Sequence, residues 1–153
     1  MRIRTGKKVK EKEKVQKEKI QKEIQALDDW VRNVKAYEQR ISVHLLKSNE
    51  KQIPDIRLAS MIPFINGEKP IFIRANEIRQ IKSAIRWGNK HHLDIVIVGG
   101  RDAWRASELL VKFDVPVILQ NVLSTPMRRF EPIHLPYEIP KILSDAGVQF
   151  CIA

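Results

Sequence analysis

The feature that most constrains the fold is an alternation of short apolar, β-branched segments with amphipathic segments, which runs from about residue 68 to residue 153. Runs of this kind are typical of parallel strands that are buried on both faces and connected by helices, so the sequence predicts an α/β fold. The expected strands are Ile71 to Arg74, Asp94 to Val98, Pro116 to Gln120 and Val148 to Ile152, and the expected helices are Glu77 to Lys90, Asp102 to Phe113 and Ile139 to Ala146.

Proline and glycine positions agree with this division. Pro116 can begin a strand, and Pro140 can lie in the first turn of a helix. Gly147 suits the left-handed position that follows a helix. Upstream, Pro54 and Pro63 restrict residues 56–65 to a short helix at most.

The first third of the chain has a different period. Apolar residues spaced by four, three, four and three residues line one face of a long helix, expected from about residue 9 to residue 46; they are Ile20, Ile24, Leu27, Val31 and Val34. This stripe can dock a coiled-coil partner or the chain's own body, and its short length favours the chain's own body. We therefore divide the chain into a basic, helical segment, residues 1–50, and an α/β part, residues 51–153.

Charge is concentrated in the same helical segment. The chain has a net charge of +10, and its first 22 residues hold ten Lys or Arg against three Glu. Such an excess attracts polyanions, but a solvated Lys/Glu-rich helix is the favoured interpretation because no nucleic-acid motif accompanies it. The segment lacks the apolar core of a secretory signal, and no stretch approaches the roughly 18 apolar residues of a membrane span. As written, the chain is expected to stay in the cytosol.

Polar residues gather where the expected strands end. Arg74-Ala-Asn76 follows the first strand, and Gly99, Gly100 and Arg101 follow the second. The carboxyl ends of parallel strands face the binding site in α/β proteins, so these residues predict a mouth that accepts a carboxylate or phosphate. In the alternative interpretation, Asn76 and Asp102 only cap helices, and the two glycines only form a tight turn.

Two further groups of residues bear on a site. Arg128, Arg129, Phe130 and His134 lie in a long loop, residues 121–136, and are candidates for ligand contact, although a solvated basic loop is the favoured interpretation. His44, His91 and His92 lie away from the mouth and predict no metal site. Cys151 lies in an apolar run, where a buried thiol is the usual outcome.

Three motifs resemble the amidohydrolase superfamily, specifically its imidazolonepropionase-related branch; they are Pro70-Ile-Phe-Ile-Arg-Ala-Asn76, Ile95-Val-Ile-Val-Gly-Gly-Arg-Asp-Ala-Trp104 and Val115-Pro-Val-Ile-Leu-Gln120. The resemblance implies a partial (β/α)8 TIM barrel, with strands five to eight of the family barrel preceded by a long N-terminal helix. It also implies hydrolysis of non-peptide C–N bonds with a divalent metal, usually zinc, in proteins that are often exported or periplasmic.

The departures from the family pattern are as informative. Metal-dependent relatives carry His-Ala-His where this chain has Arg74-Ala-Asn76, and Glu-His-Gly where it has Val98-Gly-Gly100. Neither a guanidinium nor glycine offers an imidazole lone pair, so we expect no metal ligand and no catalytic residue here. The aspartate that follows the family's eighth strand is also missing.

Three functions stay open on the sequence. The chain can be an inactive fragment of an amidohydrolase-related protein, a stand-alone module that binds an anionic small molecule, or a non-specific nucleic-acid binder acting through its basic arm. Four parallel strands of a barrel leave two open edges. We therefore expect self-association or pairing with a missing barrel half, with partial protection if the long helix covers one edge.

Overall fold

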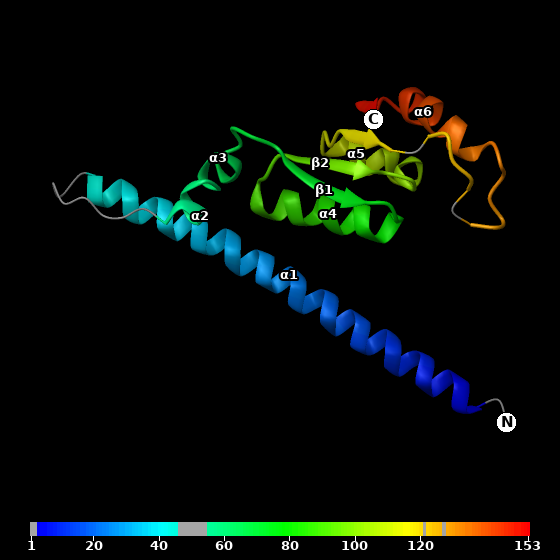
Figure 1. The fold of residues 1–153 in the computed structure, drawn as a ribbon, viewed down its shortest axis with the longest axis horizontal. Helices are drawn as coiled ribbons and strands as arrows, with labels where there is room; N and C mark the ends of the chain where they lie inside the picture. The colour runs from blue at the N-terminus through cyan, green and yellow to red at the C-terminus, as the bar shows by residue number, and fades with distance from the viewer. Residues whose placement is uncertain (1–2, 46–54, 121, 127) are drawn as a thin grey trace. The chain divides into compact units, whose positions relative to one another are not determined.

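The computed structural model describes residues 3–45, 55–120, 122–126 and 128–153, with side-chain surroundings in the first helix described for residues 14–42. Two compact units result, Met1–Ile62 and Pro63–Ala153. The predicted domain boundary at residue 50 lies outside the described residues. The elements, drawn in Figure 1, are α1 (Ile3–Leu45), α2 (Ile56–Ala59), α3 (Ile62–Ile65), β1 (Ile71–Ala75), α4 (Ile78–His91), β2 (Ile95–Gly99), the 3-10 helix η1 (Ala103–Ala106), α5 (Ser107–Lys112), β3 (Val117–Leu119), α6 (Leu135–Asp145) and β4 (Phe150–Ile152).

Helix α1 confirms the predicted long helix and begins earlier than residue 9, because its Lys- and Glu-rich start consists of good helix formers. The apolar stripe divides into two parts. Ile20 and Leu27 are 48% and 49% exposed, whereas Val31 and Val34 are buried. Side chains 14–23 are exposed, as a solvated helix requires. Among the described helices, none combines the length and apolarity needed to cross a membrane.

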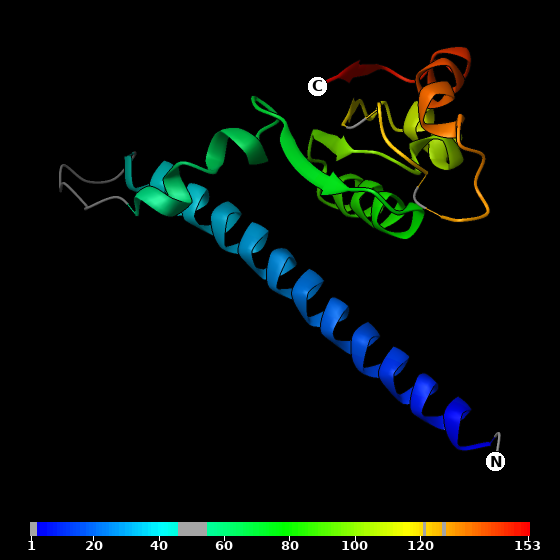
Figure 2. The same cartoon turned by 45° about the vertical axis from the view of Figure 1, so that its right-hand side comes forward.

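The second unit is built on one parallel sheet with strand order β1-β2-β3-β4. Each strand lies next to the strand that precedes it in the chain, and crossovers between parallel strands are right-handed. The crossover helices α4, α5 and α6 therefore lie on one face of the sheet, as Figure 2 lets the reader follow. This topology confirms the α/β prediction.

The core lies between that helix-covered face and the helices. Ile97 and Val117 project from the sheet into it, and Ile81, Leu110 and Leu143 project from the helices; all five are at most 1% exposed. Apolar helix faces at the predicted spacing supply these contacts, and each fully buried aliphatic side chain stabilises the fold by about 1.5–3 kcal/mol. The helix-covered face is thus a conventional α/β core.

The other face of the sheet, here called the open face, corrects two expectations. Its side chains come from the alternate positions, and they are Phe72, Arg74, Val96, Val98, Ile118 and Cys151. Phe72 is 62% exposed, and the β2 and β3 residues are half-buried. The prediction of burial on both faces is therefore wrong for this sheet. Cys151 was expected to be buried and is exposed, because it lies on an edge strand and on the open face.

Helix boundaries differ from the prediction in two places. The helix expected from Asp102 to Phe113 is a 3-10 turn followed by a separate short helix. Helix α6 begins four residues before Ile139, with Pro136 in its first turn and Pro140 inside it, so the predicted place of Pro140 is wrong. Gly147 has a φ of +77°, which confirms the left-handed position.

Candidate functional site

The carboxyl ends of β1 and β2 form the predicted mouth, and backbone hydrogen bonds fix the turns that follow them. The Gly100 N–H donates to the Ala75 carbonyl at 2.9 Å, and the Asp102 N–H donates to the Asn76 carbonyl at 2.9 Å. The two turns therefore extend the parallel pairing beyond the strands. As a result, the site residues that the sequence predicted at two separate strand ends lie close together at the carboxyl end of the sheet.

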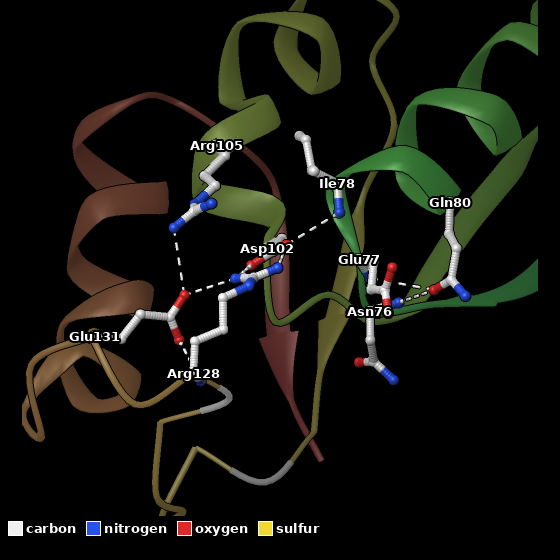
Figure 3. Close-up of polar contacts among 8 residues, drawn as sticks. All are labelled: Asn76, Glu77, Ile78, Gln80, Asp102, Arg105, Arg128 and Glu131. Atoms are coloured by element: carbon white, nitrogen blue, oxygen red, sulfur yellow. Dashed lines mark hydrogen bonds and ion pairs between the residues drawn. The ribbon is translucent and has the colours of Figure 1, made fainter. Parts of the chain in front are cut away.

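Asp102 is the most constrained polar residue at this end of the sheet. Its residue is 2% exposed, and its carboxylate accepts two hydrogen bonds from the Arg128 guanidinium, at 2.8 Å to Oδ1 and 2.6 Å to Oδ2. Oδ2 also accepts the Ile78 N–H at 3.1 Å (Figure 3). The predicted role of capping its own helix is wrong, since the carboxylate makes no bond to η1 and instead satisfies the first amide of α4.

Arg128 is held by a second carboxylate. Its Nη1 donates to Glu131 Oε1 at 2.6 Å, its backbone N–H donates to Oε2 at 3.1 Å, and Arg105 Nη2 reaches Oε1 at 3.3 Å. The Glu131 side chain is 6% exposed. Sequence reasoning missed Glu131 and Arg105. A three-residue spacing such as that of Arg128 and Glu131 indicates an ion pair only within a helix, and residues 128–131 form turns and bends.

The electrostatic consequence is a pair of stabilised charges. Hydrogen bonds from Arg128 hold the pKa of Asp102 below its ordinary value, against the opposing effect of burial. The same contacts with Asp102 and Glu131 raise the pKa of Arg128. Both groups are therefore charged at neutral pH, and they fasten the loop before α6 to the mouth.

Asn76 does not cap α4, contrary to one of the two interpretations. Glu77 is the N-cap, and Gln80 Oε1 accepts the Glu77 N–H and the Asn76 N–H, each at 3.1 Å. The Asn76 side chain lies against Gly99, where an added Cβ would be 2.5 Å from Asn76 Oδ1. Gly99 has a φ of +104°, so glycine meets both a conformational and a steric requirement there.

Gly100 has a similar local reason. Its φ is +63°, and an added Cβ would lie 2.6 Å from Val117 Cγ1. The space beside each glycine is therefore filled by a side chain of the unit itself. This geometry explains the Gly-Gly pair by packing, and close approach of a ligand stays a prediction.

The other predicted site residues are differently placed. Arg74 is exposed on the open face, and Arg101 is half-buried; neither has a hydrogen bond or ion pair to another residue in the part of the chain that the structure describes. His134 is exposed, with Nε2 3.8 Å from Glu138 Oε2. Arg129 and Phe130 are exposed as well. Arg74 and Arg101 are thus the candidate anion ligands whose guanidinium groups have no hydrogen bond or ion pair within the described part of the chain.

Two hollows lie at opposite ends of the sheet. The one at the mouth is about 30 Å³, enough for about two water molecules, and is lined by Gly99, Arg101, Asp102 and Gln120 among others. The one at the amino ends is about 530 Å³, and its polar lining includes Asp94, Asp114 and Gln149. Pockets for organic ligands usually measure about 300–1,000 Å³, so the mouth of a single copy does not enclose such a ligand.

Across the described residues, no group of three or more His, Cys, Asp or Glu side chains is placed to hold a metal ion. No protein-family model matches the chain, and no curated protein matches it. A crystal structure of an amidohydrolase from Thermotoga maritima MSB8 matches 84% of this chain with a TM-score of 0.72 and 20% sequence identity.

This likeness is one of fold. The chain spans about a third of the length of the solved amidohydrolase, 33% by coverage. It therefore has the fold of part of an amidohydrolase-like barrel, with four parallel strands in one sheet, which confirms the predicted partial barrel. Membership of the imidazolonepropionase-related branch and the assignment to strands five to eight stay predictions.

Proposed function

We propose that this chain is part of an amidohydrolase-related protein and that it binds the anionic group of a small molecule at the mouth. The fold likeness supports the relationship, and the unpaired guanidinium of Arg74 at the end of β1 is the observation that carries the binding role. Hydrolysis of non-peptide C–N bonds is assigned to a complete barrel, not to this chain alone. By the resemblance to the family, Arg74-Ala-Asn76 and Gly99 stand where metal-dependent relatives carry imidazoles, which supports that division.

Arg74 suits an anion for chemical reasons. Its guanidinium is permanently charged and presents a planar fork of N–H donors that matches a carboxylate or a phosphate. A charged side chain that is exposed at the carboxyl end of a parallel strand has no structural duty in the described unit. Arg101, at the end of the neighbouring strand, can provide a second contact.

Arg128 provides the contrast within the same chain. Its donors are directed at Asp102 and Glu131, so an added anion would have to displace two carboxylates, one of them almost fully buried. The proposed ligand contacts are therefore Arg74 and Arg101, and Arg128 serves to position the loop. This assignment reduces the candidate anion-binding residues that the sequence suggested to Arg74 and Arg101.

The test measures anion binding by the full chain. Inorganic phosphate and succinate are titrated at constant ionic strength, and amide chemical shifts are followed by NMR. Loss of a charge-assisted hydrogen bond costs about 1.5–3 kcal/mol, so Arg74→Ala is expected to weaken binding roughly tenfold to hundredfold.

Arg86→Ala is the matched control, because Arg86 is exposed on α4 and its loss lowers the net charge by the same amount. Affinity in this variant should stay within about twofold of the unmodified chain, as expected for a distant, screened charge. Equal losses in the two variants would show that only net charge attracts the anion. Absence of saturable binding would remove the proposed function.

A further inference from the structure

The first edge strand, β1, has half of its backbone unpaired within the sheet. The Ile71 N–H donates to the Asp94 carbonyl at 2.7 Å, and the Ala75 carbonyl accepts the Gly100 N–H at 2.9 Å; Asp94 and Gly100 directly flank β2, so Ile71 and Ala75 bond on the β2 side. In a parallel ladder, alternate residues bond to opposite sides, so Phe72 and Arg74 direct their N–H and C=O groups away from β2. Among the strands of the described sheet, β1 pairs with β2 alone.

The second edge strand, β4, repeats this arrangement on the other side. The Val117 N–H donates to the Gln149 carbonyl at 2.9 Å, and the Ala153 N–H donates to the Leu119 carbonyl at 3.0 Å. Phe150 and Ile152 therefore direct their backbone groups away from β3. Ile152 is also 58% exposed, so the sheet of the described residues has two edges that can accept a further parallel strand.

The open face has the composition of a barrel interior. Val96, Val98 and Ile118 lie on it in adjacent strands, and branched aliphatic residues of this kind fill the interiors of (β/α)8 barrels. All the crossover helices lie on the opposite face. Half of an eight-stranded barrel has this division between a helical exterior and an apolar interior.

We propose that a second copy of this chain closes the sheet into an eight-stranded barrel, with the two-fold axis along the barrel axis. That axis keeps all strands parallel and places β4 of each copy beside β1 of the other, so both edges are paired at once. Four strands from each copy make the eight that such barrels contain. Closed two-fold symmetry also leaves no edge for further growth.

The charge of the sheet unit itself does not oppose this dimer strongly. Residues 63–153 contain twelve Lys or Arg and nine Asp or Glu, so most of the net charge of +10 belongs to the other unit. Screening at physiological salt acts over about 8 Å, which weakens the remaining repulsion. The inference rests on the sheet and not on the proposed ligand, so measurements without added anion test it separately.

The experiment measures molar mass by sedimentation over a range of concentrations at physiological salt. The expected result is a discrete species with twice the chain mass of 17.8 kDa. Val98→Lys places an ammonium in the barrel interior and is expected to shift the chain to monomer. Val111→Lys is the control, since Val111 is 46% exposed on α5, on the helical side, and this variant should stay dimeric.

A second variant tests the same dimer in case Val98→Lys fails to fold. Phe72→Lys changes a residue that is already 62% exposed, and it should give a folded monomer with the circular dichroism of the unmodified chain. A monomeric unmodified chain at high concentration would overturn the proposal. Polymers larger than the dimer would overturn it too, because they indicate edges that pair without closing.

The single cysteine separates this dimer from the competing one in which two β4 edges pair. In a closed eight-stranded barrel, a strand spacing of about 4.8 Å and a tilt of about 36° place opposite strands roughly 15 Å apart. The two copies of Cys151 lie on opposite strands, beyond the Cα separation of about 4.4–6.8 Å that a disulfide needs. Mild oxidation should therefore leave the dimer free of disulfide. Rapid formation of a Cys151 disulfide would instead indicate β4–β4 pairing and overturn the barrel.

Discussion

The carboxyl ends of the neighbouring strands β1 and β2 differ in how their charged side chains are paired. At the end of β2, Asp102 is buried and its carboxylate meets Arg128 and an amide of α4. At the end of β1, Arg74 is exposed and has no such partner among the described residues. A charged residue at a strand end is therefore not a binding residue by position alone. What distinguishes the two is whether the fold itself supplies an opposite charge.

The largest expected effect comes from removing Asp102. Asp102→Ala leaves the Ile78 amide and Arg128 without their acceptor. Because removing one partner of a buried ion pair is strongly destabilising, this should cost about 3–5 kcal/mol and lower Tm by at least roughly 12 °C. Arg74→Ala should shift Tm by less than about 2 °C, because substitutions at exposed, unpaired positions have small effects. Thermal unfolding followed by circular dichroism measures both. Equal changes in Tm in the two variants would show that the ends of β1 and β2 do not differ in this way.

A smaller effect is expected at Gly99, where the two strand ends meet. Gly99→Ala adds a methyl group 2.5 Å from Asn76 Oδ1 and forces alanine to a φ of +104°, and should cost about 2–3 kcal/mol. Gly147→Ala is the control, since its φ is +77° and nothing lies within 4 Å of the added atom. It should cost about 1 kcal/mol from backbone strain alone. Urea unfolding of the two variants gives the steric part as their difference, and no difference would mean that Asn76 does not pack against Gly99.

The smallest effect is a dependence on acid that only the Asp102 side should show. The pKa of Asp102 is lower in the folded chain than its ordinary value near 3.8, so the unfolded chain takes up the proton first as pH falls. The stability that the ion pair provides is complete above that ordinary value and is lost as pH falls through the lowered pKa. The difference in unfolding free energy between the unmodified chain and Asp102→Asn should thus not change with pH around pH 6, and it should shrink below about pH 4. Urea unfolding at a series of pH values measures it, and a difference that does not change with pH would contradict this origin.

Much of the fold was accessible from the sequence, because it depends on local patterns. The β-branched runs and the helical spacing predicted all four strands and the three crossover segments with boundaries within a few residues, although the second crossover is a 3-10 turn followed by a short helix. Gly147 was placed correctly because a positive φ is a local property of glycine. The partial barrel was expected from the resemblance of three sequence motifs to the amidohydrolase superfamily, and the likeness in fold to the Thermotoga maritima amidohydrolase agrees with it.

The site was less accessible, because its contacts join residues far apart in the chain. Asp102 and Arg128 are 26 positions apart, and no local pattern shows that their side chains meet. A local interpretation therefore assigned Asp102 to a cap and Arg128 to a ligand, and the folded chain pairs them with each other. Asn76 and Gly99 are a second case, since only the parallel pairing of β1 and β2 brings them together.

The sequence by itself determined the parallel α/β order, the long basic helix and the concentration of polar residues at the strand ends, since periodicity and composition act over a few neighbouring residues. The tertiary structure alone decided which of those polar residues are used internally. It also decided that one sheet face stays open and that Cys151 is exposed, because burial depends on which elements surround a strand. Arg74 differs from Arg128 for that physical reason: the chain folds two carboxylates against one guanidinium and none of its described carboxylates against the other.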